Sequence, residues 1–311
     1  MGATLEPLQL RPLGIGEIFD RAVTLYVRNF LLFTIISAFL VVPLSVVNYF
    51  ITTQRAGTFA QILDQIQHPS RSPAAAAMPF GPWLLVLVAV SFLITPFMYV
   101  ATASALGRIY NGELADWRAA YGIALRHAVS IVVTAIFQVM ILAAAAFVGA
   151  LVLGFALIAA FLLVRAVAPL GVITIVLTVV LLIAYIVGLM LCYLAVALAF
   201  DAIGIEEAPF GRAISSSFAR IFNRSEAGKA ALICLAFLAV ELGLTVVAGV
   251  ADGLIEAFLH QPVIETIVQG LISLVTTGFI AVLLAVYYFD VRIRREGLDM
   301  QAAIDQLQAQ P

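Results

Sequence analysis

The sequence predicts an all-α integral membrane protein with six transmembrane helices, and three observations lead to this fold class. The chain of 311 residues is 64% hydrophobic and only 11% charged, with a mean hydropathy of +1.12, whereas soluble domains carry about a quarter charged residues. Uncharged runs long enough to cross a membrane recur along the chain. Basic residues gather in alternate connections between these runs. Together these features indicate a polytopic membrane protein.

The apolar runs define the six spans. A helix needs roughly 20 apolar residues to cross the hydrocarbon, because no water is present there to satisfy the backbone. Glu241 is the one charge inside any of the candidate runs, which are 29–54, 83–107, 128–164, 166–200, 230–251 and 266–289.

The third run is too long for a simple crossing. As one helix, 128–164 would measure about 55 Å against a hydrocarbon core near 30 Å. We expect it to tilt, to project outward or to break near Gly149 or Gly154. The sequence leaves open whether the 128–200 region contains broken helices.

The basic residues orient the spans. With six crossings, thirteen of the sixteen basic residues fall on the side of the N-terminus, and only Arg55, Arg71 and Arg165 fall on the other. Lys and Arg accumulate in cytoplasmic connections. We therefore expect both termini to lie in the cytoplasm and the protein to reside in a prokaryotic cytoplasmic membrane.

Three segments ahead of the span pairs share a pattern that indicates an internal repeat. They are "GEIFDRAVTLYVRNF" from Gly16, "GELADWRAAYGIALRH" from Gly112 and "APFGRAISSSFARIF" from Ala208, and each contains an Arg-Ala pair. Each shows the amphipathic period of a helix lying at the membrane surface. In the third, the predicted apolar face is Phe210, Ile214, Phe218, Ile221 and Phe222, opposite Arg212, Ser216 and Arg220.

The predicted unit is one interfacial elbow helix followed by a transmembrane hairpin, used three times. The repeats span approximately 14–106, 112–200 and 207–290 of a single membrane domain, 1–290, and a cytoplasmic tail follows at 291–311. Units with two spans each keep the same orientation, so they relate by an axis along the membrane normal. A six-helix bundle with rough threefold pseudosymmetry is the expected result.

Both ends of the chain resemble a known family. The opening "LRPLGIGEIFDRAVTLYVRNF", the third elbow and the closing "YYFDVRIRREGLD" are together similar to the glycerophosphoryl diester phosphodiesterase membrane-domain family and its uncharacterised six-helix bacterial relatives. The resemblance implies a membrane domain that gathers lipid-derived substrates or partner proteins. Members that hydrolyse glycerophosphodiesters add a soluble barrel, which takes about 250 residues. Only a tail follows residue 290 here, so the resemblance does not imply that activity.

A polar stripe along the fifth span is one candidate site. Glu241, Thr245, Asp252, Glu256 and His260 are spaced by 4, 7, 4 and 4 residues, so they share one side of a continuous helix. A carboxylate near the bilayer centre is costly and is expected to face the interior. The stripe could relay protons or admit a cation. Alternatively, Glu241 is protonated and hydrogen-bonded to Gln138, Gln269 or Asn48, and the outer residues only cap the surface.

A collar of arginines is the second candidate site. Its predicted members are Arg21, Arg118 and Arg212 of the elbows and Arg292, Arg294 and Arg295 after the last span. Arginines at the inner leaflet attract anionic headgroups. Asp290 and Glu296 are expected to pair with these arginines or with the basic elbows, which makes the closing segment a clamp between the final span and the elbows.

The sequence favours a non-catalytic role. It contains no phosphate-binding loop, zinc-protease motif or nucleophile elbow, and Cys192 and Cys234 lie in apolar runs, so we expect no cofactor, metal site or disulfide. The expected partners are the lipid bilayer, anionic headgroups and a membrane protein, with no nucleic acid. The leading hypothesis is a scaffold, lipid-interacting or assembly factor. The alternative is a small-solute, proton or ion transporter that uses the polar stripe.

Overall fold

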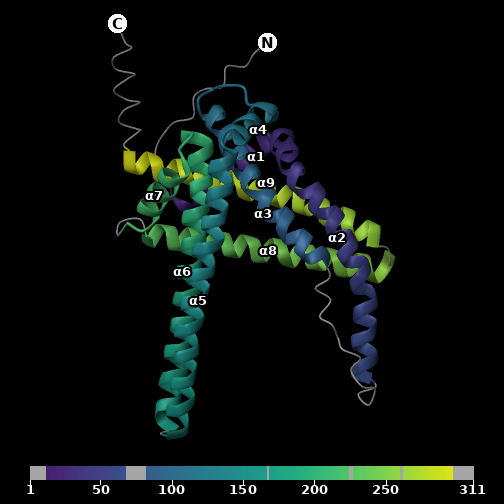
Figure 1. Cartoon of the computed structure of the whole chain (residues 1–311), viewed down its shortest axis with the longest axis vertical. Coiled ribbons are helices and arrows are strands. Elements are labelled where there is room, and N and C mark those ends of the chain that lie inside the picture. Colours follow the sequence, from purple (N-terminus) through teal and green to yellow (C-terminus); the bar gives the residue numbers. More distant parts are fainter. Residues whose placement is uncertain (1–11, 68–81, 167, 224–226, 260–261, 297–311) are drawn as a thin grey trace.

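The computed structural model describes residues 12–67, 82–166, 168–223, 227–259 and 262–296 (Figure 1). Within this part of the chain every regular element is an α-helix. The nine helices are α1 (Ile15–Arg28), α2 (Phe30–Gln67), α3 (Pro82–Tyr110), α4 (Trp117–Arg126), α5 (Ala128–Ala166), α6 (Ala168–Glu206), α7 (Phe210–Ile221), α8 (Ala227–Leu259) and α9 (Pro262–Glu296). Six of them contain a segment long and apolar enough to cross a membrane. The predicted all-α class with six apolar helices is therefore confirmed.

The three short helices, α1, α4 and α7, occupy the three predicted elbow segments and are called the elbow helices below. Each ends with a backbone N–H that reaches back four residues: Asn29 to Leu25 at 3.1 Å, His127 to Ile123 at 3.2 Å and Phe222 to Phe218 at 2.9 Å. These bonds complete the last helical turn before the chain changes direction. At α1 and α4 a single cap residue, Asn29 or His127, separates the elbow helix from the span that follows.

The core lies where α3, α6 and α9 meet near their C-terminal ends, a region called the helix junction below. Buried residues run without interruption through 100–106 of α3, 194–204 of α6 and 281–291 of α9. A helix that is buried on all sides is surrounded by protein rather than by lipid or water. Gly204 permits a close approach of α6 to α3, because a Cβ there would lie 2.5 Å from the carbonyl oxygen of Val100.

A second contact joins α2 to α9 along their spans. A Cβ at Gly270 would lie 2.9 Å from Oγ of Ser45, so the missing side chain lets the helices approach closely. Nearby, Nδ2 of Asn48 donates to Oε1 of Gln269 at 2.8 Å. Small residues and interhelical amide bonds are typical contacts between helices in membranes.

The α5–α6 hairpin differs from the rest of the molecule. Each arm has 39 residues, which is about 58 Å at 1.5 Å per residue. Figure 1 shows the pair extending away from the other helices. The arms pack on one another at Gly149, where a Cβ would lie 1.8 Å from the ring of Tyr185. The predicted break near Gly149 or Gly154 does not occur, because α5 is one continuous helix from Ala128 to Ala166.

Candidate functional site at the elbow helices

Asp290, near the end of α9, is the centre of the first ion-pair network. Its side chain is fully buried and pairs with Nζ of Lys229 at 2.5 Å and Nε of Arg294 at 3.1 Å. The same carboxylate accepts a hydrogen bond from the backbone N–H of Leu13 at 2.6 Å. The Leu13 carbonyl in turn accepts from Lys229 and Arg294, at 2.9 and 2.6 Å. Three distant segments, the starts of α1 and α8 and the end of α9, are therefore held together at one point.

Glu206, at the end of α6, is the centre of the second network. Its Oε1 accepts from Nη2 of Arg220 at 2.8 Å, lies 3.5 Å from Nε of Arg292, and also accepts from the hydroxyl of Tyr288. Nη1 of Arg220 donates to the Tyr288 oxygen at 2.6 Å. Arg295 adds a hydrogen bond to the Ala219 carbonyl at 2.8 Å. The elbow helix α7 is thus tied to α6 and α9. The two networks together are called the charged collar.

The buried face of α7 corrects one sequence prediction. Arg220 is only 8% exposed, whereas Phe210 and Phe222 are 41% and 51% exposed. The sequence placed Arg220 on the polar face of α7, opposite an apolar face that was expected to contact lipid or the bundle. Amphipathic period alone cannot tell a lipid-facing apolar side from a core-facing one. A buried guanidinium needs an anionic partner, and Glu206 supplies it.

The outer surfaces of the elbow helices combine exposed arginines with exposed apolar residues. Arg28 of α1, Arg118 and Arg126 of α4 and Arg212 of α7 are all exposed. Beside them, Val27, Leu125 and Phe222 are 65%, 66% and 51% exposed. Basic and apolar side chains that share an outer surface suit the boundary between headgroups and acyl chains.

The six predicted collar arginines therefore separate into two groups. Arg292, Arg294 and Arg295 lie within the charged collar, and half-buried Arg21 hydrogen bonds with Tyr110. The remaining two, Arg118 and Arg212, are exposed. The expected pairing of Asp290 with an arginine is present, and Glu296 has no described side chain.

The described part of the polar stripe lies near α3 and α6, because Glu241 interacts electrostatically with Tyr99 of α3 and Tyr193 of α6. Glu241 and Thr245 are exposed on α8, and the Thr245 hydroxyl donates to the Glu241 carbonyl at 2.7 Å. Of the partners expected for Glu241, Asn48 and Gln269 bond to each other instead. The side chains of Asp252 and Glu256, and all of His260, lie outside the described residues.

Several network residues could not be chosen from the sequence. Lys229 is one of the thirteen basic residues that orient the spans, and no sequence motif singles out Glu206. Asp201 of α6 was not singled out, although it is 1% exposed and its Oδ2 has no hydrogen-bond partner among the described residues. The one available signal is a Phe-Asp pair at the end of two helices, 200–201 in α6 and 289–290 in α9.

Tyr121 anchors α4 to the first hairpin. Its hydroxyl donates to the carbonyl of Ile36 in α2 at 2.8 Å, and burial raises the pKa of the phenol well above its usual range. The phenol therefore stays protonated and keeps donating at physiological pH. Across the described part of the chain, no group of three or more His, Cys, Asp and Glu side chains is arranged to hold a metal ion.

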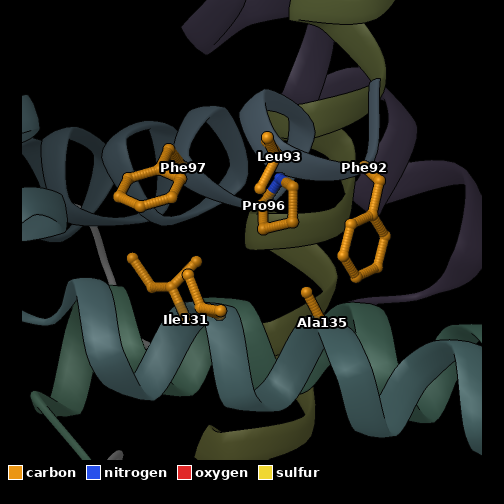
Figure 2. Close-up of a pocket in the computed structure, with 7 residues that line it drawn as sticks. Phe92, Leu93, Pro96, Phe97, Ile131 and Ala135 are labelled. Atoms are coloured by element: carbon orange, nitrogen blue, oxygen red, sulfur yellow. The ribbon is translucent and has the colours of Figure 1, made fainter. Parts of the chain in front are cut away.

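A small apolar hollow lies between α3 and α5 (Figure 2). It is lined by Phe92, Leu93, Pro96, Phe97, Ile131, Val132 and Ala135, and it has room for about one water molecule. Figure 2 shows the labelled side chains of the two helices pointing into the gap between them.

The comparisons with known proteins do not assign the chain to a family. No protein-family model matches the chain, and neither the curated proteins nor the solved structures contain a match.

Proposed function

We propose that this is a non-catalytic multi-pass protein of a prokaryotic cytoplasmic membrane, with both termini inside, that acts as a lipid-interacting scaffold. The observation that carries the proposal is the contrast between two sets of arginines. Arg220, Arg292 and Arg294 pair with the acids of the charged collar, whereas Arg28, Arg118, Arg126 and Arg212 are exposed on the elbow helices, which also carry exposed apolar residues. The second set suits anionic headgroups at the cytoplasmic leaflet.

The same proposal includes three repeats of elbow helix plus hairpin. In support, each elbow helix packs against the last helix of one hairpin: α4 on α3, α7 on α6 and α1 on α9. The first helices of the hairpins follow the same order, with α5 on α3, α8 on α6 and α2 on α9. The three last helices also touch one another. A cyclic arrangement of equivalent contacts is what repeats about a common axis would produce.

The transporter alternative rests on the polar stripe. A pathway residue should line a water-filled interior, and Glu241 is an exposed carboxylate of α8 that interacts electrostatically with Tyr99 of α3 and Tyr193 of α6. A relationship to the glycerophosphoryl diester phosphodiesterase membrane-domain family remains part of the proposal, and it rests on the motifs at the two ends of the chain.

Lipid retention tests the proposed function. One exposed arginine from each elbow helix, Arg28, Arg118 and Arg212, is changed to Gln, and the matched control changes the same three to Lys. Phosphatidylglycerol and phosphatidylethanolamine that co-purify are then counted by mass spectrometry. Since each surface arginine attracts anionic lipid by about 1 kcal/mol, the Gln variant should lose most of its phosphatidylglycerol and the Lys variant should keep it. Equal retention in all three proteins would contradict a headgroup role.

A further inference from the structure

The side chains of His127 and Glu207 connect two joints between helices. His127 is the single residue between α4 and α5, and Glu207 comes directly after the end of α6, before α7 begins. Nε2 of His127 lies 3.8 Å from Oε2 of Glu207. Phe137 of α5 also stacks on Phe210 of α7, with ring centroids 6.1 Å apart. The His–Glu contact therefore links the joint that follows α4 to the joint that precedes α7.

The hydrogen bond of the imidazole defines where its first proton lies. Nδ1 of His127 is 3.1 Å from the carbonyl oxygen of Ile123. Because a carbonyl oxygen only accepts, Nδ1 carries a proton. In a neutral imidazole Nε2 then carries none, and its lone pair faces the carboxylate of Glu207. The contact becomes attractive only when Nε2 is protonated as well, which makes the ring an imidazolium.

The backbone of Glu207 supports a role for its carboxylate. Within the described part of the chain it is the one non-glycine residue with a positive φ, at 50°. Glycine is the usual residue at a left-handed position after a helix, because it has no Cβ to clash there. Strained backbone of this kind persists where the surrounding structure requires it. A glutamate in place of glycine at this joint is explained if its side chain is needed opposite His127.

Glu207 is the charged group that faces His127. Among the described residues it is the ion-pair partner of the imidazole, and Glu206 beside it pairs with Arg220 and Arg292 instead. Arg165 lies at the opposite end of α5, and residues 30–54 of α2 carry no charge. The other charged residues on α4 and on the helices that pack against α4 and α5 form no described ion pair with His127; they are Arg118 and Arg126 of α4, Arg108 of α3, Asp201 of α6, and Arg212 and Arg220 of α7.

We propose that His127 and Glu207 form a pH-sensitive tie between the joint of α4 with α5 and the joint of α6 with α7. The tie is present when both ring nitrogens are protonated and is lost when Nε2 gives up its proton. An imidazole changes charge near about pH 6.5, so mildly acidic conditions close the tie and alkaline conditions open it. The tie does not depend on the proposed lipid role, because neither residue is one of the exposed arginines.

Nitrogen NMR of the full-length protein tests the protonation of the ring. His68 and His260 are changed to Gln, so that His127 is the only histidine left. At about pH 8 the ring should carry its proton on Nδ1, and at about pH 5.5 both nitrogens should be protonated. A proton on Nε2 alone at the alkaline pH would overturn the proposal, because Nε2 could then donate to Glu207 without any change of charge.

A double-mutant cycle measures the tie itself. His127→Gln, Glu207→Gln and the double variant are unfolded in detergent beside the unchanged protein at both pH values. Ion pairs with an exposed partner change the unfolding equilibrium constant by about two- to fivefold. We expect a coupling of this size at the acidic pH and about onefold at the alkaline pH. Equal coupling at the two pH values, or no coupling at the acidic one, would overturn the tie.

Two further cycles with His127→Gln separate the carboxylate from the backbone and from general charge effects. Glu207→Gly keeps the left-handed backbone and removes the acid, so its coupling should equal that of Glu207→Gln. A clearly different coupling would assign the effect to backbone strain and contradict the role of the carboxylate. Glu113→Gln changes another exposed acid, in the turn between α3 and α4, and should give about onefold coupling at both pH values. A coupling at Glu113 as large as at Glu207 would contradict a specific contact.

Discussion

The helix junction with its charged collar and the α5–α6 hairpin are built on opposite principles. At the junction, α3, α6 and α9 are buried on every side, and ion pairs fix the ends of helices that are distant in sequence. The outer part of the hairpin consists of two long apolar arms, and only 6% of the hydrophobic window in α5 is buried within the protein. The difference teaches that specific side-chain contacts define the fold at the helix junction, whereas lipid must surround the outer part of the α5–α6 hairpin.

The largest effect is expected at Asp290. Changing it to Ala leaves Lys229, Arg294 and the Leu13 N–H without their acceptor, and removing one member of a buried ion pair typically costs about 3–5 kcal/mol. Unfolding in detergent, followed by circular dichroism, should show a much lower midpoint. The exposed carboxylate of Asp20 provides the control, since Asp20→Ala should stay within about 0.5 kcal/mol. Similar midpoints for the two variants would contradict the role given to the collar.

A matched pair on α7 tests which face of that elbow points inward. Arg220→Ala removes the partner of Glu206 from a buried network and should cost about 3 kcal/mol. Arg212→Ala, eight residues earlier on the same helix, changes an exposed side chain and should have almost no effect on stability. The same unfolding assay measures both. A loss of stability at Arg212 as large as the loss at Arg220 would contradict the burial of Arg220.

Substitutions at two glycines compare how tightly the helix junction and the α5–α6 hairpin are packed. Gly204→Ala places a Cβ against the backbone oxygen of Val100 and should destabilise by about 1–3 kcal/mol. Gly154→Ala meets nothing within 4 Å and should stabilise α5 by up to about 1 kcal/mol through helix propensity. Thermal midpoints of the purified variants give the comparison. Equal shifts would mean that the two regions are packed alike.

The smallest effect is expected at Asp201, inside the junction. Its Oδ2 has no hydrogen-bond partner among the described residues, so Asp201→Asn keeps the size and should change stability by less than about 0.5 kcal/mol. Asp290→Asn, at the other Phe-Asp pair, loses two ion pairs and should be clearly destabilised. If the two Asn variants lose stability equally, the carboxylate of Asp201 has a role that this account does not include.

The sequence predicted the elements well because the bilayer imposes their length and polarity. Apolar runs of more than 20 residues, five of them uncharged and one interrupted only by Glu241, gave all six apolar helices, and amphipathic period gave the three elbow helices. Most of the pairings inside the charged collar could not be predicted from the sequence. Lys229 and Leu13 meet Asp290 across 61 and 277 residues, and no local pattern encodes such a contact.

The direction in which side chains point from their helices was the other feature that the sequence could not predict. An amphipathic helix at a membrane surface has two apolar environments available, the protein core and the lipid, and the pattern of α7 fits both. Arg220 was therefore placed outside although it is buried. For Glu241 the cost of a charge at membrane depth predicted an inward position; the side chain is exposed on α8 and interacts electrostatically with Tyr99 of α3 and Tyr193 of α6.

The position of the elbow helices in the membrane tests the central claim most directly. After Cys192 and Cys234 are replaced by Ala, a single cysteine at Phe222 or at Arg212 carries a spin label in reconstituted vesicles. We expect the label at 222 to collide mainly with apolar oxygen and the label at 212 mainly with a water-soluble nickel chelate, as for a helix lying at the headgroup boundary. If both labels reach the nickel chelate, or if both are shielded from either reagent, the elbow helices do not lie on lipid and the proposed function is wrong.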